Sequence, residues 1–148
     1  MADYIFDLDG TLANCDHRLH FIQNKPKNWK AFFDGMDCDA PITSTIALAH
    51  SLYGSYDNLI FCTGRPDNYR RITREWLVAH VGDWTLNCLL YMRRAGDGRP
   101  DYVIKEEALL SMRADGYDPK IAFEDRDQVV DMWRRNGLIC CQVAKGAY

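Results

Sequence analysis

Two aspartates at the end of a short apolar run are the residues of this chain best suited to chemistry. Residues 4–6 predict a hydrophobic strand, and the sequence DLDGT follows it at positions 7–11. Because alternate residues of an extended chain point to the same side, Asp7 and Asp9 are expected to lie next to each other. Gly10 permits a tight turn directly after them. Two carboxylates this close repel each other unless a cation joins them.

The cation that suits this arrangement is Mg²⁺, because the predicted ligands are oxygens and Asp125 reaches the same edge from another strand. A carboxylate held against Mg²⁺ and a phosphoryl group can attack phosphorus and form an aspartyl-phosphate. A second carboxylic acid can protonate the leaving oxygen and then deprotonate the hydrolytic water. The alternative is an ordinary strand-ending turn, in which Asp and Gly are common. The strand before the motif and Thr11-Leu12 after it favour the catalytic interpretation.

A phosphate near Asp7 needs hydrogen-bond donors that offset its charge in the transition state. Thr63 can supply a hydroxyl, and the backbone N–H groups of Gly64 and Arg65 are expected where a helix begins, which favours anion binding. The alternative for this segment is a plain strand-to-helix turn. Lys105 can act as a point charge on the phosphate and the nucleophile; its alternative is a solvated helix lysine.

The elements that must position these residues alternate along the chain. Strands are predicted at 4–6, 59–62, 86–92, 121–123 and 138–143, and helices around 29–33 and over 41–53, 66–80, 101–114 and 127–136. Continuous apolar strands that alternate with helices predict a single α/β domain, residues 1–148, with a parallel sheet covered on both faces. In such sheets ligands bind outside the carboxyl ends of the strands, which is where the candidate residues lie.

Composition narrows the class of protein. The chain has 148 residues, a net charge of −3 and no apolar run near the ~20 residues that cross a bilayer. This charge disfavours a protein that binds nucleic acid through a broad basic surface, but it allows one that binds the end of a strand through a few arginines. Six cysteines without CxxC spacing do not support a zinc site. With no visible secretory signal, we expect free thiols and a cytoplasmic location.

Four segments resemble the motifs of the haloacid dehalogenase (HAD) superfamily of phosphotransferases. They are residues 7–12, Thr63-Gly64-Arg65, Lys105 and Glu124-Asp125. The segments 62–66, 103–107 and especially 125–135 resemble more narrowly the 3′-phosphatase domain of bacteriophage polynucleotide kinase–phosphatase, and the likeness runs over residues 4–148. The resemblance implies a Rossmann-like HAD fold and hydrolysis of 3′-phosphate, including 2′,3′-cyclic phosphate, from DNA or RNA ends.

The resemblance also implies a role for each site residue. Asp7 is the implied nucleophile and Asp9 the general acid–base, with Thr63 and Lys105 as catalytic partners. The Asp7 carboxylate, the Asp9 main-chain carbonyl and the Asp125 carboxylate are the implied Mg²⁺ ligands. The implied substrate-binding residues are Arg18, Gly64, Arg65 and Arg126.

The chain departs from that pattern in two respects. Glu124 stands where the family usually has Asp, and no GxxxxGK[ST] loop for ATP is present in the sequence. We therefore expect a phosphatase without kinase activity, working beside a separate kinase or ligase. The alternatives are a mononucleotide or small-metabolite phosphatase, and a non-catalytic module that binds phosphorylated ends.

The segments between the motifs are too short for a large cap, so we expect little or no cap domain and an open cleft that admits a polymer end. Trp29, Phe32 and Phe33 can stack on a terminal base or simply pack their helix. A positive rim or solvated surface charge is expected from five arginines, Arg70, Arg71, Arg93, Arg94 and Arg99. His17 and His20 are expected to be surface or structural residues.

Overall fold

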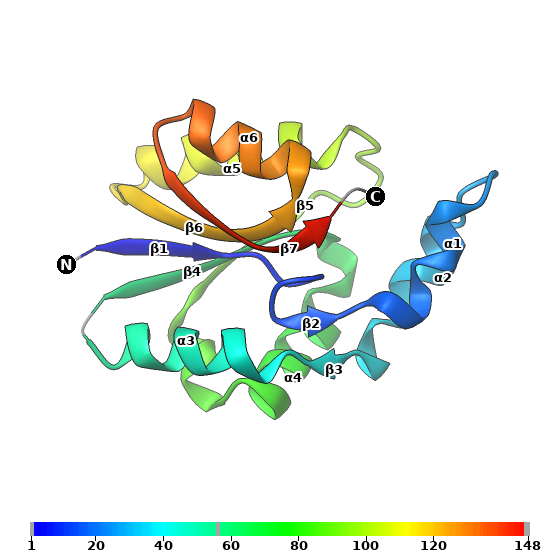
Figure 1. Ribbon diagram of the computed structural model, residues 1–148, viewed down its shortest axis with the longest axis horizontal. Coiled ribbons are helices and arrows are strands. Elements are labelled where there is room, and N and C mark those ends of the chain that lie inside the picture. Colours follow the sequence, from blue (N-terminus) through cyan, green and yellow to red (C-terminus); the bar gives the residue numbers. More distant parts are fainter. Residues whose placement is uncertain (1, 56, 147–148) are drawn as a thin grey trace.

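A five-stranded, all-parallel β-sheet forms the centre of the computed structural model, which describes residues 2–55 and 57–146 (Figure 1). The strands are β1 (Asp3–Phe6), β2 (Ala13–Asn14), β3 (Ala40–Pro41), β4 (Asn58–Pro66), β5 (Leu89–Arg93), β6 (Pro119–Arg126) and β7 (Ile139–Gly146). The central sheet has the order β5-β4-β1-β6-β7, and β2 and β3 pair separately as a short antiparallel ribbon. The predicted parallel α/β fold is confirmed.

Helices cover both faces of this sheet (Figure 1). The α-helices are α1 (His20–Gln23), α2 (Trp29–Asp34), α3 (Thr43–Tyr53), α4 (Arg70–His80), α5 (Asp101–Ala114) and α6 (Asp127–Arg135). The 3₁₀ segments are η1 (Asp16–Arg18), η2 (Met36–Cys38), η3 (Asp67–Tyr69) and η4 (Asp83–Asn87). Helices α3 and α4 lie on one face, and α5 and α6 on the other. No helix in the described ranges is long and apolar enough to cross a membrane.

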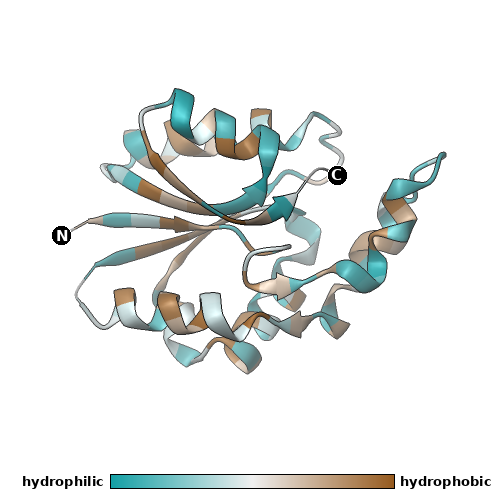
Figure 2. Cartoon of the chain, in the orientation of Figure 1, coloured by the Kyte–Doolittle hydropathy of each residue, from teal (hydrophilic) through white to brown (hydrophobic). Residues whose placement is uncertain are grey.

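Two apolar clusters, one on each side of the sheet, hold the layers together. Trp76 and Leu77 of α4 pack on one face and Met112 and Trp133 of α5 and α6 on the other. Figure 2 shows hydrophobic residues along the middle of the strands and in bands on the helices that cover the sheet, with hydrophilic residues toward the strand ends. Burial of these apolar surfaces is the main force that fixes the strand ends relative to one another, so the core sets the geometry of the site.

Several element boundaries differ from the sequence prediction, among them those at Pro41 and Leu89. Pro41 was expected to open a helix, but it pairs with Ala13 in the β2–β3 ribbon, and α3 begins only at Thr43. The strand predicted over 86–92 begins at Leu89, because the residues before it form η4. The Arg74 guanidinium holds the Thr85 and Cys88 carbonyls in that turn. Neither shift moves the predicted site.

Residues 15–39 form a small helical insert between β2 and β3, and it projects beyond the carboxyl edge of the sheet (Figure 1). It contains η1, α1, α2 and η2 and is far smaller than a separate domain, in agreement with the expected lack of a large cap. The six cysteines are free thiols, as expected, and four of them are buried.

Candidate active site

The carboxyl ends of three neighbouring strands bring the predicted residues together. In the register of the sheet, Phe6 of β1 lies beside Phe61 of β4 on one side and Phe123 of β6 on the other. The residue after Phe6 is Asp7, so it comes level with the polar ends of both neighbours, and its N–H donates to the Phe123 carbonyl at 3.0 Å. Parallel pairing therefore assembles the site from segments more than fifty residues apart.

Lys105 of α5 lies at the floor of this site and is buried. Its ammonium donates to Asp7 Oδ1 at 2.7 Å and to Glu124 Oε2 at 2.8 Å. A buried ammonium bonded to two carboxylates is not a solvated helix lysine. Its position leaves Asp7 Oδ2 to accept from the Thr11 hydroxyl at 3.2 Å, so both oxygens of Asp7 are oriented.

Two of the carboxylates bonded to this lysine, those of Asp7 and Glu124, also lie close to a third acidic residue, Asp125. Asp7, Glu124 and Asp125 are all buried, and one carboxylate oxygen of each lies within 4.8 Å of the others. Burial, reinforced by the charge of Glu124, raises the pKa of Asp7 to about 8 despite the opposing effect of Lys105. Burial likewise raises the pKa of Glu124 to about 7. A second cation would relieve this excess of negative charge, and an all-oxygen donor set fits Mg²⁺.

Glu124, the residue that departs from the family pattern, has defined contacts here. Its Oε2 accepts from Lys105, and its Oε1 accepts from the backbone N–H groups of Asp125 and Arg126 at 3.1 and 3.3 Å. Glu124 therefore holds the backbone from which the Asp125 carboxylate extends. The described acidic cluster contains Glu124 rather than the Asp9 side chain.

The Asp9 carboxylate turns instead toward two arginines. Arg65 Nη2 lies 2.5 Å and Arg18 Nη2 lies 2.6 Å from Asp9 Oδ1. Burial opposes ionisation of Asp9, but the guanidinium groups of Arg65 and Arg18 outweigh it and lower its pKa to about 2. Asp9 is thus a carboxylate at neutral pH.

Arg18 and Arg65, the expected substrate-binding residues, are held by carboxylates inside the site. Both side chains are buried, and besides Asp9 both bond to Asp39, at the end of the insert. The Arg18 guanidinium also lies 4.2 Å from the centre of the Phe32 ring. Because burial of such charges requires ion pairing, these arginines orient Asp9 rather than face an open surface. No sequence signal marked Asp39.

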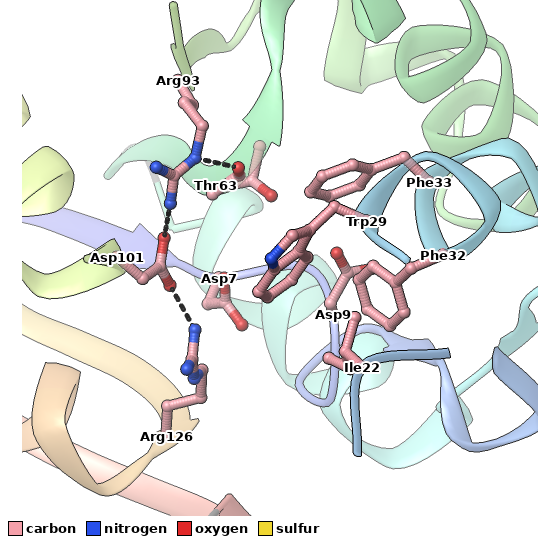
Figure 3. Close-up of a pocket in the computed structure, with 11 residues that line it drawn as sticks. Asp7, Asp9, Ile22, Trp29, Phe32, Phe33, Thr63, Arg93, Asp101 and Arg126 are labelled. Atoms are coloured by element: carbon pink, nitrogen blue, oxygen red, sulfur yellow. Dashed lines mark hydrogen bonds and ion pairs between the residues drawn. The ribbon is translucent and has the colours of Figure 1, made fainter. Parts of the chain in front are cut away.

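Arg126 and Arg93 meet at an acidic residue that the sequence analysis also missed. Asp101, the first residue of α5, lies 3.4 Å from Arg126 Nη1 and 3.4 Å from Arg93 Nη2 (Figure 3). Arg93 also donates to the Gly64 carbonyl at 2.9 Å. Asp101 stands four residues before Lys105 on the same helix and lies 3.5 Å from its ammonium; this i, i+4 spacing was the available signal.

The segment after Thr63 corrects one expectation. Strand β4 continues to Pro66 and α4 starts only at Arg70, so no helix begins at Gly64 and Arg65. The Arg65 N–H, expected to bind phosphate, donates to the Thr63 hydroxyl oxygen at 3.3 Å. The Thr63 hydroxyl proton keeps its capacity to donate, and Thr63 and Gly64 both line the hollow above Asp7.

That hollow encloses about 440 Å³, including its open mouth. Asp7 and Asp9 lie at its base, Arg93, Asp101 and Arg126 on one side, and aromatic side chains of the insert on the other (Figure 3). The aromatic side is formed by Ile22, Trp29, Phe32 and Phe33. A cavity with two carboxylates at its base, arginines on one wall and rings on the opposite wall suits an anionic ligand that carries an apolar group.

Three arginines of the predicted positive rim, Arg71, Arg93 and Arg99, pair with acidic side chains. Arg71 pairs with Glu75, Arg99 pairs with Asp97 and Glu107, and Arg70 donates to the Leu90 carbonyl. His17 bonds to Asp39 at 2.8 Å, in keeping with its expected structural role. Surface arginines therefore contribute less positive charge around the hollow than the sequence suggested.

Comparison with known proteins places this geometry in a family. Residues 2–148 match the model of the polynucleotide kinase PNKP phosphatase domain. The chain is similar to solved chains of the "Pnkp1/Rnl/Hen1 complex" (32% identity, TM-score 0.83) and the "Pnkp1/Rnl/Hen1 RNA repair complex" (31% identity, TM-score 0.81). These matches cover 99% and 100% of this chain but 47% and 44% of those chains, so it spans about half their length.

More distant similarity extends to the class C acid phosphatase from Bacillus anthracis, with a TM-score of 0.72 at 11% identity over 99% of this chain and 68% of that one. Likeness at that identity shows a shared fold alone. The match to the family model, by contrast, covers nearly every residue, including the acidic strand ends, the buried lysine and the arginines of the site. The chain therefore belongs to the polynucleotide kinase PNKP phosphatase domain family of HAD phosphatases and is a phosphoric monoester hydrolase.

Proposed function

We propose that this chain removes the terminal phosphate from the 3′ ends of DNA or RNA, with Mg²⁺ and through a phosphoryl group carried by Asp7. The observation that carries the proposal is the contact between the Lys105 ammonium and Asp7 Oδ1 at the base of a hollow that also exposes the Asp9 carboxylate. Membership of the family and likeness to chains of an RNA repair complex support a polynucleotide end as substrate.

In the first half of the reaction, a carboxylate oxygen of Asp7 forms a bond to phosphorus as the bond from phosphorus to the 3′ oxygen breaks. Lys105 and Thr11 hold the carboxylate in orientation, and the Thr63 hydroxyl can donate to a phosphoryl oxygen. The leaving 3′ oxygen takes a proton from Asp9. The products are a 3′-hydroxyl end and an aspartyl-phosphate.

In the second half, Asp9 removes a proton from water, whose oxygen attacks the phosphorus and releases inorganic phosphate from Asp7. The low pKa of Asp9 keeps this carboxylate ionised and therefore able to accept a proton, although pairing with Arg65 and Arg18 also weakens it as a base. For the first half Asp9 must acquire a proton, and the negative charge of a bound phosphate favours this because it raises the pKa of a neighbouring carboxyl group. Arg18 and Arg65 are positioning residues in this scheme.

The residues that would hold Mg²⁺ are Asp7 and Asp125, through their carboxylates, and Asp9, through its main-chain carbonyl. When bound, Mg²⁺ offsets the negative charge of the carboxylates and of the phosphoryl group. The crowding of the Asp7, Glu124 and Asp125 carboxylates, with the Lys105 ammonium bonded to two of them, supports this assignment.

Phosphate release from matched substrates tests the proposal. We expect wild-type protein with Mg²⁺ to hydrolyse 3′-phosphorylated DNA and RNA oligonucleotides faster than a free nucleoside monophosphate, and a 2′,3′-cyclic end provides a further comparison. Asp7→Asn should abolish hydrolysis, whereas Asp131→Asn, at an exposed position on α6, should not change it. Faster turnover of the free mononucleotide would favour a small-metabolite phosphatase instead.

Removal of a 3′-phosphate leaves a hydroxyl end, which is the substrate of a polynucleotide ligase. We therefore infer that a separate ligase or kinase acts in sequence with this chain. The solved chains to which it is similar come from complexes whose names include Rnl and Hen1 beside Pnkp1. Co-purification of the full chain with a ligase of the same source would test this partnership.

A further inference from the structure

One exposed aromatic residue of the insert faces the hollow without belonging to the core. Trp29 is 42% exposed, whereas Trp76 and Trp133 are 3% and 1% exposed. Trp29 nevertheless lines the same hollow as Asp7 and Asp9, and its indole lies on the aromatic side above them (Figure 3). An exposed indole beside reactive carboxylates is a surface on which a flat ligand group can stack.

The position of this indole is set by its neighbours. The Phe33 ring lies nearly parallel to it, with centroids 5.9 Å apart, and the Phe32 ring meets it edge-on at 5.8 Å. Phe33 packs against Tyr69, whose hydroxyl donates to Asp34 Oδ1 at 2.8 Å and so ties α2 to the segment before α4. The aromatic wall is thus attached to the body of the protein rather than carried on a free loop.

The same wall is also connected to the acidic centre. The Arg18 guanidinium lies over the Phe32 ring, donates to the Phe32 carbonyl at 3.0 Å, and donates to Asp9 Oδ1. One residue therefore links the position of the aromatic wall to that of the proposed acid–base group. If the phosphate of a ligand lies at Asp7, the part of the ligand next to that phosphate lies against the aromatic wall.

Two lysines lie next to the aromatic wall, toward the exposed end of the insert. Lys25 and Lys27 lie in the loop between α1 and α2, and the Lys27 ammonium lies 5.5 Å from the centre of the Trp29 ring. A cation–π contact at an exposed site is weaker than stacking of a base on an indole. A base can therefore displace Lys27, whose charge then remains close to the next phosphate of a strand.

From these observations we propose that the insert binds the 3′-terminal nucleotide of the substrate, with its base stacked on Trp29 and the preceding phosphate near Lys27. The inference rests on the proposed function and deepens it, because it assigns the preference for a nucleotide end to the insert rather than to the phosphate-binding residues. Stacking does not depend on base identity, so the site accepts any of the four bases.

Two oligonucleotide substrates of equal length test this directly. One ends in a normal nucleoside 3′-phosphate and the other in an abasic 3′-phosphate. We expect wild-type kcat/KM to be about 5- to 150-fold higher for the base-bearing end, the range that corresponds to stacking of one base. Trp29→Ala should bring this ratio close to one, and Trp29→Phe should retain most of it.

Controls separate stacking from folding and from the proposed function. Leu110→Ala, at an exposed apolar position of α5 outside the hollow, should leave the ratio unchanged; Trp29→Leu keeps bulk without an aromatic ring and should lose the preference even if the alanine variant fails to fold. An unchanged ratio in Trp29→Leu overturns the inference. Equal turnover of both ends by the wild type overturns base stacking alone, whereas no turnover of either end overturns the proposed function.

Discussion

Arg65 contacts both oxygens of the Asp9 carboxylate. Its Nε lies 3.1 Å from Oδ1 and 3.1 Å from Oδ2, and its Nη2 lies 2.5 Å from Oδ1. Arg65 comes from β4 and Asp9 from the turn after β1, so this pair joins the second and first motifs. A planar guanidinium orients a carboxylate in a way that a single ammonium does not.

Arg65→Lys should therefore impair positioning while keeping the charge. We expect kcat/KM on a 3′-phosphorylated oligonucleotide to fall by about 10²-fold, the effect of misplacing a reacting group. Loss of the bidentate contact should also raise the pKa of Asp9 and move the acidic limb of the pH profile upward. Arg71→Lys, at an exposed position paired with Glu75, is the matched control. If kcat/KM falls equally at every pH and the acidic limb of its pH profile does not move, Arg65 does not position Asp9.

Gly64 leaves no room for a side chain. A Cβ atom at this position would lie 2.9 Å from Asp101 Cγ and still closer to Asp101 Oδ1. Because Arg93, Arg126 and Lys105 surround that carboxylate, Asp101 cannot move freely. Gly64→Ala should lower kcat by at least about 10-fold through misplacement, with little change in far-UV circular dichroism. Gly98→Ala, which meets no atom within 4 Å, should leave steady-state kinetics intact.

Lys105 should matter for stability as well as for catalysis. Lys105→Met removes the ammonium that Asp7 and Glu124 share, and loss of one member of a buried ion pair costs about 3–5 kcal/mol. Urea denaturation at pH 8 would measure the change in the free energy of unfolding. Lys120→Met removes an exposed lysine paired with Asp118 and should change it by less than about 0.5 kcal/mol. Equal stability of both variants would refute the structural role.

Stability without metal should fall as the pH rises from about 4 to about 8. The pKa values of Asp7 and Glu124 are raised to about 8 and about 7 in the folded chain. Between their unfolded and folded values the native state binds more protons than the unfolded state, so the free energy of unfolding decreases with pH. Asp9, with a pKa of about 2, titrates below this range.

Bound Mg²⁺ should oppose that loss, because a cation favours ionised carboxylates. We expect the rise in Tm caused by MgCl₂ relative to EDTA to be larger at pH 8 than at pH 5. Asp7→Asn removes one of the two acids with a raised pKa and one proposed ligand, and should reduce the difference between the two pH values. A metal effect that is the same at both would count against Mg²⁺ binding at this cluster.

The local pattern of the sequence was enough to predict the parallel sheet and the acidic strand ends. Apolar runs that stop at Asp7, Thr63 and Glu124 identify buried strands, and parallel strands with helical connections place such ends at one edge. These predictions succeeded because they depend on the periodicity and termini of single segments. Lys105 required the family resemblance, because nothing local separates a buried lysine from an exposed one.

The network behind Asp9 was decided only by the tertiary structure. Asp39 carries no motif, and Arg18 and Arg65 looked like surface ligands for phosphate until folding buried them. The reason is physical: a buried charge must be paired, and its partner depends on where the insert and α5 pack. The amino-acid sequence thus determines which side chains reach the carboxyl edge of the sheet. The packing of the insert and α5 determines which of these side chains form ion pairs with one another and which line the hollow.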